Sequence, residues 1–341
     1  MIKAYRVSFP EALRAELVEF ELDERLQGKE VLVQAEYSVI SPGTEGASFS
    51  GLEREHPIAR NFAYPRATTG YGHLSRVLAV GPDVTDLKVG DRILSFSPHA
   101  SYWKWDSGRF FLHVPPEADG KRAVFTRMAG VAITAVRKSS VQIGDTVAVV
   151  GLGLVGNFAA QLFQMAGAEV MGLDVAASRL ERARQCGIQR VVNPTGRSAR
   201  EAVLEWTGGQ GARIVVEAIG RSDLILEGVE FTRRHGEILL LGSPRALHTA
   251  EVTPMLSRIH IQGITMIGAL EWLYPIPELD FTRVSITRNY QQLLGWIMDG
   301  RLAIDPLLTH VLSPVRCQEA YMGLHAQKDE YLGVVFDWSL L

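Results

Sequence analysis

A glycine-rich turn is the clearest chemical feature of the sequence. It directly follows an apolar run, Thr146–Val150, and opens a helical stretch. In such a context the first glycine makes a tight turn, the second lets the backbone approach a pyrophosphate, and the third lets helix and strand pack closely. The helix N-terminus then offers unpaired N–H groups to phosphates. The pattern predicts a dinucleotide-binding turn formed by Gly151, Leu152, Gly153, Leu154, Val155 and Gly156.

An acid and an arginine follow this turn. Asp174 ends the next apolar run, where a carboxylate can bind the ribose hydroxyls of the adenosine and repel a 2′-phosphate. This position favours NAD over NADP. Arg179 leaves the alternative open, because an arginine can receive a 2′-phosphate, although it can equally begin a solvated helix face.

Two further turns follow apolar runs in the same region. Because ligands of open α/β sheets bind at the carboxyl ends of parallel strands, both turns are candidates for cofactor contacts. The alternative is that they are ordinary strand-to-helix turns. The candidate residues are Ala218, Ile219, Gly220, Gly242 and Ser243.

The elements that must position these residues alternate between strand and helix. This alternation predicts a parallel sheet with crossover helices. The predicted strands are Thr146–Val150, Glu169–Leu173, Arg190–Val192, Ile214–Glu217, Glu237–Leu241 and Gly263–Ile267, and the clearest helices are Val155–Met165 and Ser178–Cys186. Before residue 120 the texture changes to short alternating segments such as Glu30–Glu36, which are typical of half-buried strands.

Composition excludes several classes of protein. The 341 residues correspond to about two domains. A net charge of −3 gives no basic excess for binding nucleic acid. Two cysteines, Cys186 and Cys317, can form neither a disulfide framework nor an all-cysteine metal site. The N-terminal segment has no apolar core of signal-peptide length, and no long unbroken apolar run suggests a membrane span, so we expect a soluble, cytoplasmic protein.

The sequence as a whole resembles the medium-chain dehydrogenase/reductases, the superfamily of alcohol and polyol dehydrogenases. The marks of this resemblance are Ser41-Pro-Gly-Thr-Glu45, the segment Val80–Ile93, the glycine turn and the segment Ile304–Val311. The resemblance implies an α/β fold with two parts. A GroES-like, partly open β-barrel domain is expected at residues 1–121 and 269–341, and a doubly wound parallel Rossmann domain at 122–268. It also implies that the substrate meets the nicotinamide in a cleft between the two.

The sequence departs from the zinc-dependent members at the positions that hold the metal. Where those members have a cysteine, a histidine and a third ligand, this chain has Pro42, Tyr71 and, near the third position, Arg127. None of the three is a zinc ligand. A catalytic zinc would need other ligands, of which His73 and His99 are the first candidates. We therefore expect no zinc. The Ser-Pro-Gly-Thr-Glu form also resembles a zinc-less branch that includes the bacteriochlorophyllide hydroxyethyl dehydrogenases, as do Thr309-His310 and Asp337-Trp338.

Without a metal, other groups must polarise the substrate oxygen. Thr44 corresponds to a relay hydroxyl of the family, and Tyr71, in a ligand position, should present its phenol to the substrate. Both can instead be structural, as a turn residue and as core packing. Glu45 is a candidate to orient a donor or accept a proton, or a paired structural acid. His73 and His99 are candidates for proton exchange. Arg127 is a candidate to bind an anionic substrate group or the pyrophosphate.

Two aromatic segments bear on substrate and assembly. If Pro98–Trp105 and Glu271–Tyr274 line the cleft, the substrate is bulky or apolar. Alternatively, Glu271–Tyr274 is buried in a subunit interface. By resemblance to the family we expect a homodimer or homotetramer that acts on a small-molecule substrate, with no nucleic-acid or membrane partner.

The sequence thus predicts an NAD-dependent, zinc-independent oxidoreductase that interconverts an alcohol, bulky or secondary, and its carbonyl. Two alternatives remain open. One is an NAD(P)H-dependent enone or quinone reductase, which also works without zinc. The other is a non-catalytic dinucleotide-binding protein that lost its activity together with its metal ligands.

Overall fold

The computed structural model describes residues 1–52 and 63–341, and it divides the chain into two compact units. The first unit holds the residues up to Arg127 together with Pro275–Leu341, and the second holds Met128–Tyr274. Helix α3 (Thr126–Lys138) begins in the first unit and continues into the second. Each unit is described by itself below.

The first unit is built on a strongly bent sheet of seven strands. The strands are ordered β14-β15-β3-β4-β5-β7, and β6 pairs with the same long strand, β3, that also pairs with β4 and β15. A separate two-stranded antiparallel sheet is formed by β1 and β2. The strands are β1 (Ile2–Ser8), β2 (Glu16–Leu22), β3 (Glu30–Val39), β4 (His73–Val80), β5 (Arg92–Ser95), β6 (Tyr102–Asp106), β7 (Phe111–His113), β14 (Leu308–Leu312) and β15 (Gly333–Asp337).

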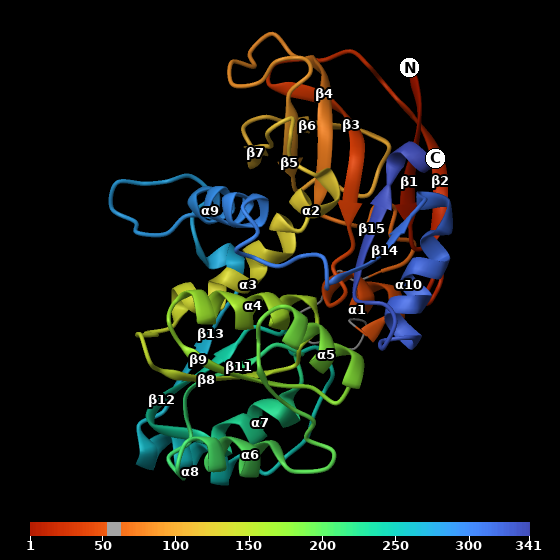
Figure 1. Cartoon of the computed structure of the whole chain (residues 1–341). Helices are drawn as coiled ribbons and strands as arrows, with labels where there is room; N and C mark the ends of the chain where they lie inside the picture. Colours follow the sequence, from red (N-terminus) through yellow and green to blue (C-terminus); the bar gives the residue numbers. More distant parts are fainter. Residues whose placement is uncertain (53–62) are drawn as a thin grey trace. The chain divides into compact units, whose positions relative to one another are not determined.

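Short helices surround this sheet (Figure 1). They are α1 (Thr44–Ser50), α2 (Gly120–Ala123), α9 (Ile286–Met298) and α10 (Cys317–Ala326), with single 3-10 turns η3 (Pro314–Arg316) and η4 (Trp338–Leu340). One core cluster joins the N-terminal strand, α1, α10 and β15, where Phe9 packs edge-on against Phe49 and Tyr321. This core fixes α1 against α10, and α1 begins within the Ser41–Glu45 motif.

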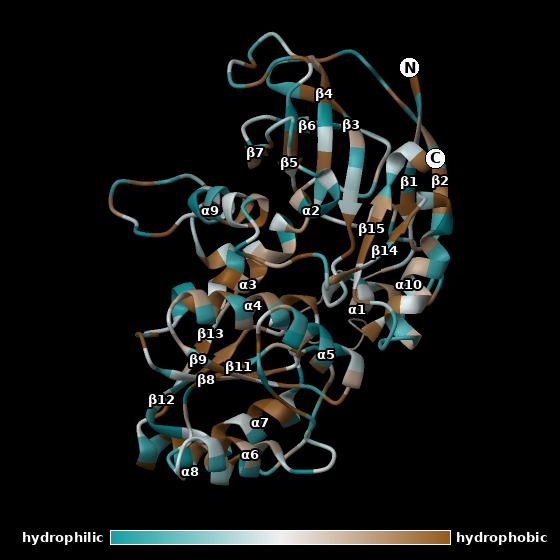
Figure 2. Ribbon diagram, in the orientation of Figure 1, coloured by the Kyte–Doolittle hydropathy of each residue, from teal (hydrophilic) through white to brown (hydrophobic). Residues whose placement is uncertain are grey.

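The second unit is a six-stranded, fully parallel sheet ordered β10-β9-β8-β11-β12-β13. Helices α4 and α5 cover one face, and α6, α7 and α8 cover the other (Figure 1). The strands are drawn mainly brown in Figure 2, as expected for strands buried on both faces. The elements are β8 (Thr146–Val150), α4 (Leu154–Met165), β9 (Glu169–Leu173), α5 (Ala177–Gln185), β10 (Arg190–Val192), α6 (Ala199–Trp206), β11 (Ala212–Glu217), α7 (Ser222–Glu230), β12 (Thr232–Leu240), α8 (Thr253–Gln262), β13 (Thr265–Gly268) and η2 (Glu271–Leu273).

The predicted fold class is confirmed, and the six predicted strands of the parallel sheet are all present. The largest difference is β12, which begins at Thr232 instead of Glu237. Its first residues are polar, and His235 adopts a left-handed backbone conformation (φ +55°) at an irregularity in the pairing with β11. The polar, interrupted start hides this half of the strand from a search for apolar runs. In the described part of the chain, no helix is long and apolar enough to cross a membrane.

Candidate functional site

The glycine turn after β8 has the geometry that a dinucleotide requires. Gly151 has a φ of +92°, a conformation that residues with a side chain rarely adopt. A Cβ added at Gly153 would meet nothing within 4 Å, so the space at this turn is open. A Cβ added at Gly156 would overlap the carbonyl oxygen of Gly151. The turn leads directly into α4, whose first N–H groups have no helical carbonyl to bind. The residues present therefore fit a pyrophosphate.

Asp174 lies beside this turn, directly after β9. Its carboxylate accepts one hydrogen bond from the N–H of Leu152 (2.8 Å) and another from the N–H of Ala176 (2.9 Å). The guanidinium of Arg179 approaches the same carboxylate at 3.5 Å. The acid and the arginine on which the cofactor prediction depends are thus neighbours, and the acid is held against the glycine turn.

The two later turns lie against the first one. A Cβ added at Gly151 would overlap the side chain of Ile219, and one added at Gly220 would overlap the carbonyl oxygen of Ser243. A Cβ added at Gly242 would in turn overlap the backbone of Gly220. Ala218 is bound to the sheet by a hydrogen bond from its N–H to the carbonyl of Val150 (2.9 Å). The predicted cofactor residues of the second unit thus form one surface at the carboxyl ends of β8, β11 and β12.

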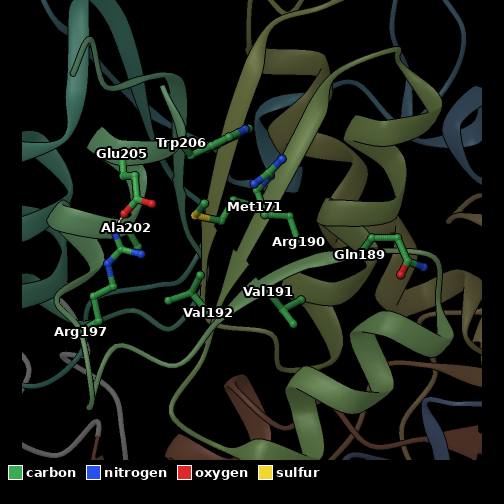
Figure 3. Close-up of a pocket in the computed structure, with 9 residues that line it drawn as sticks. All are labelled: Met171, Gln189, Arg190, Val191, Val192, Arg197, Ala202, Glu205 and Trp206. Carbon is green, nitrogen blue, oxygen red and sulfur yellow. Dashed lines mark ion pairs between the residues drawn. The ribbon is translucent and has the colours of Figure 1, made fainter. Parts of the chain in front are cut away.

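A pocket of about 680 Å³ lies elsewhere on the second unit, beside the edge strand β10 (Figure 3). Arg197 and Glu205 form an ion pair on one wall, and the guanidinium of Arg190 lies 5.3 Å from the ring centre of Trp206. The pocket contains none of the residues predicted for the cofactor, and we assign it no function. Its lining residues are Met171, Gln189, Arg190, Val191, Val192, Arg197, Ala202, Glu205 and Trp206.

The first unit brings together Tyr71, Arg127 and the segment next to Pro42, the positions that the resemblance assigns to zinc ligands. The hydroxyl of Tyr71 donates a hydrogen bond to the hydroxyl of Ser41 (2.5 Å), and Ser41 directly precedes Pro42. The guanidinium of Arg127 lies over the ring of Tyr71, 4.5 Å from its centre. Ser41, Tyr71 and Arg127, which are far apart in the sequence, therefore lie together.

Arg127 is caged by aromatic rings. Its side chain is 1% exposed; it lies over Tyr71 and, at 4.8 Å, over Phe96, and it donates a hydrogen bond to the hydroxyl of Tyr290. Phe110 completes this cluster by packing against both Phe96 and Tyr290. A guanidinium inside such a cage is not open to an anionic substrate group or a pyrophosphate, contrary to the role expected for Arg127.

Glu45 is a buried, paired acid. One oxygen of its carboxylate accepts hydrogen bonds from Tyr321 (2.5 Å) and His99 (3.0 Å), and the other accepts the N–H of Ser41 (2.8 Å). Burial and the neighbouring carboxylate raise the pKa of Tyr321 well above its ordinary value, so its hydroxyl remains a donor. Glu45 thereby fixes Ser41, the hydrogen-bond partner of Tyr71.

His99 belongs to the same buried network. Its other ring nitrogen lies 2.7 Å from the hydroxyl of Ser38, which also accepts a hydrogen bond from the indole of Trp338 (2.9 Å). Both ring nitrogens are thus engaged inside the protein, and the side chain has no exposed surface. The structure places His99 as a support for Glu45, away from solvent.

His73 and Thr44 differ in burial: His73 is fully buried, whereas Thr44 is exposed. His73 is fully buried on β4, with Nε2 3.0 Å from the carbonyl oxygen of Ala100, and burial lowers its pKa to about 4. A histidine that stays neutral and bonds to the backbone is a structural residue. Thr44 is the first residue of α1 and is exposed, as a residue that meets a substrate must be.

The residues of this region do not fit a zinc ion. A proline, a tyrosine and an arginine occupy the ligand positions, and the cation of Arg127 would repel a metal. Nor does the rest of the described chain, residues 1–52 and 63–341, bring together three or more His, Cys, Asp or Glu side chains in a group that could hold a metal ion. We derive no step through zinc.

The tryptophans of the first aromatic segment pack away from Tyr71. Trp105 is buried in the core of the bent sheet, and Trp103 packs against Phe20, 6.3 Å between ring centres. In the other segment Glu271 is buried, whereas Trp272 and Leu273 are about half exposed. The tryptophans of the first segment therefore give no support for a bulky, apolar substrate.

Comparison with known proteins finds dehydrogenases that are similar to this chain. Residues 155–279 match the family model described as zinc-binding dehydrogenase. Over 94% of this chain and 97% of the relative, the sequence is 27% identical to D-guloside 3-dehydrogenase of Escherichia coli. It is 26% identical to sorbitol dehydrogenase of Halalkalibacterium halodurans, over 85% of this chain and 88% of the relative. These matches agree with the resemblance to the medium-chain dehydrogenase/reductases.

The fold is shared with solved members of this superfamily. A dehydrogenase of Sinorhizobium meliloti, described as a putative zinc-binding dehydrogenase bound to NADP, superimposes with a TM-score of 0.82 at 18% identity, covering 99% of this chain and all of the other. The solved structure shows a shared fold, and the curated relatives support an alcohol dehydrogenase-like oxidoreductase. The narrower resemblance to the bacteriochlorophyllide enzymes stays a prediction.

Four polar residues were not predicted from the sequence, one beside the turns of the cofactor surface and three around Tyr71, Glu45 and Arg127. Ser41 could have been predicted, because it begins the motif that contains Thr44 and Glu45. Glu217 ends a predicted strand, and an acid at the end of an apolar run is a usable signal. Tyr290 and Tyr321 gave no sequence signal, because a tyrosine on an amphipathic helix looks like any other core residue.

Proposed function

We propose that this protein interconverts a secondary alcohol of a polyol or sugar and the corresponding ketone, using a nicotinamide dinucleotide and no zinc. The observation that supports this most strongly is the cluster of Tyr71, Ser41 and Arg127 at the positions where metal-dependent relatives bind zinc. The cluster keeps a hydrogen-bond donor and a positive charge where the family has a Lewis acid, but it lacks metal ligands.

The second unit would hold the dinucleotide. The glycine turn and the first N–H groups of α4 fit the pyrophosphate, and Asp174 fits the ribose hydroxyls of the adenosine. When bound, the nicotinamide gives or takes a hydride at its C4 atom. We propose NAD as the preferred cofactor, because the carboxylate of Asp174 would repel a 2′-phosphate. The nearby Arg179 supports residual binding of NADP.

The first unit would act on the substrate oxygen. In the direction of reduction, negative charge develops on the carbonyl oxygen as the hydride arrives. When the Ser41 hydroxyl turns to donate to the Tyr71 oxygen, the single proton of the phenol can be donated to the substrate oxygen and then transferred to it, leaving a phenolate that Ser41 stabilises. Arg127, stacked on the same ring, stabilises the developing charge from behind. Thr44, an exposed hydroxyl next to Pro42, is the second candidate donor.

The substrate class follows from the polarity of this region and from the relatives. Ser41, Thr44 and Tyr71 present hydroxyl groups, whereas the tryptophans that suggested an apolar substrate pack in the core. Two full-length relatives are named as dehydrogenases of a guloside and of sorbitol. Both facts favour a polyhydroxylated substrate.

We also propose that the protein is a homo-oligomer assembled through β13. This strand lies at the edge of the parallel sheet, so one side of its backbone has no partner strand among residues 1–52 and 63–341. Met266, Leu270, Trp272 and Leu273, on and after the strand, are all substantially exposed. Exposed apolar edge strands pair readily with a second copy. Sedimentation equilibrium should give a dimer or tetramer of the 37.6 kDa chain, and a monomer would contradict the proposal.

The function is tested by turnover. Purified protein is incubated with NAD⁺ or NADP⁺ and a panel of polyols, glycosides and simple alcohols, and with NADH or NADPH and ketones, enones and quinones. We expect formation of NADH with polyols or glycosides. Reduction of enones or quinones alone would show the reductase of the alternative prediction. Binding of NADH without turnover on any panel would show a non-catalytic protein.

A further inference from the structure

Glu217 is a fully buried carboxylate in the middle of the parallel sheet. It is the last residue of β11, flanked by Val150 of β8 and Leu240 of β12, and its side chain has no exposed surface. Burial raises its pKa above the ordinary value, with Asp223 adding a smaller effect in the same direction. A carboxylate in such a place needs hydrogen bonds to offset its lost hydration.

Those hydrogen bonds come from the turn that follows the strand. The N–H groups of Ile219 and Gly220 lie 2.9 Å from one carboxylate oxygen, Gly220 is also 2.9 Å from the other, and the N–H of Arg221 is at 3.3 Å. Three consecutive backbone donors thus point at one anion, an arrangement that fixes the turn's conformation.

This turn is wedged between the other two turns of the cofactor surface. Its Ile219 lies against Gly151 of the glycine turn, and Gly220 lies against Gly242 and Ser243. The backbone carbonyl of Glu217 also accepts the N–H groups of Leu241 (2.9 Å) and Gly242 (2.8 Å). A change in the conformation of residues 218–221 would therefore disturb all three turns.

We propose that Glu217 is a positioning residue for dinucleotide binding: its carboxylate holds residues 218–221 in the conformation that shapes the cofactor surface. It acts through backbone atoms, which is why no binding motif contains it. The proposal rests on the dinucleotide-binding part of the proposed function.

The neighbouring strand offers a matched control. Glu237 on β12 is also a buried glutamate, and it accepts hydrogen bonds from the N–H of Ser140 (3.0 Å) and from its hydroxyl, with Arg213 at 3.7 Å. It pairs with Ile214, toward the other end of β11, away from the three turns. Substituting Glu237 tests the general cost of losing a buried acid from this sheet.

The test is the dissociation constant of NADH, measured by fluorescence titration with the full-length protein, so no substrate is required. E217A removes the acceptor of three consecutive backbone N–H groups and should weaken binding by about tenfold or more. E217Q keeps one amide oxygen as acceptor and should lie between E217A and wild type. E237A should bind NADH as wild type does, even if thermal unfolding shows that it loses as much stability as E217A.

The outcomes distinguish a failure of the proposed function from a failure of the positioning role of Glu217. If wild type binds neither NADH nor NADPH, the proposed function itself is wrong. If wild type binds but E217A retains wild-type affinity, or weakens no more than E237A, the positioning role is overturned. Should E217A fail to fold, the same comparison is made between E217Q and E237Q, and equal affinities there would overturn the role.

Discussion

The hydroxyl of Tyr71 donates a hydrogen bond of 2.5 Å to the hydroxyl of Ser41. Ser41 is itself held by Glu45, whose carboxylate accepts the Ser41 N–H and is bound by His99 and Tyr321. The phenol is thus the outermost, half-buried member of a network that is otherwise buried. Such an arrangement fixes the position of the phenol, which can donate its proton to a substrate once the Ser41 hydroxyl donates to the Tyr71 oxygen instead.

Replacing Tyr71 with phenylalanine removes this donor and keeps the ring on which Arg127 lies. We expect Y71F to lower kcat/KM by about 100-fold, the usual contribution of a single positioned proton donor, with no change in NADH affinity. Y102F is the matched control, because the Tyr102 hydroxyl of the same unit only accepts a hydrogen bond from Gln34. The measurement is the steady-state kcat/KM of wild type, Y71F and Y102F. A wild-type value for Y71F would show that the phenol is not the proton donor.

Arg127 is expected to act through its charge. In R127M a side chain of similar length loses the cation, and kcat/KM should fall by about tenfold or more, whereas R127K should recover part of the loss. Circular dichroism checks that both variants are folded. Equal kcat/KM values for folded R127M and R127K would show that the charge has no role.

Asp174 is expected to set the cofactor preference. D174N keeps an oxygen that can accept the Leu152 N–H but removes the negative charge, so affinity for NADPH relative to NADH should rise by about tenfold. Asp145 provides a control, because its carboxylate accepts the Gln142 N–H just before β8, at the other end of the sheet. Titrations of wild type, D174N and D145N with both cofactors give the ratios. Tighter binding of NADPH than NADH by wild type would refute the preference itself.

His73 predicts a pH dependence of stability. Because burial holds its pKa at about 4, below the ordinary 6.5, the folded protein binds fewer protons than the unfolded chain between these values. Stability is therefore lost as the pH falls from about 6.5 to about 4, and this one group accounts for about 3 kcal/mol of the loss. H73Q retains a donor for Ala100 but does not titrate. Urea unfolding at pH 7 and pH 4.5 should show a smaller decrease for H73Q, and equal decreases would count against a neutral, buried His73.

The cofactor surface could be predicted from the sequence, because close backbone approach restricts residue type locally. Gly151 and Gly156 must lack a Cβ, and both belong to one short motif beside a recognisable strand. Asp174 follows from the same logic at the end of the next strand. In these cases the structural requirement on a residue and the sequence pattern that reveals it lie within a few residues of each other.

The polar network of the first unit could be predicted only in part. Glu45 and Tyr71 were predicted from motif positions, but Tyr321, which binds Glu45, and Tyr290, which binds Arg127, lie on distant helices. Tertiary packing alone brings these groups together. Burial also changed the interpretation of His73 and Arg127, because a sequence does not show whether a charged or titratable side chain faces solvent.

We propose that this protein turns over its substrate without zinc. The most direct measurement is the zinc content of the purified, active enzyme, together with its kcat before and after treatment with a strong chelator. We predict substoichiometric zinc and an unchanged kcat, because Tyr71 and Arg127 occupy the ligand positions. Stoichiometric zinc, with activity that is lost on chelation and restored by added zinc, would show that the enzyme depends on zinc.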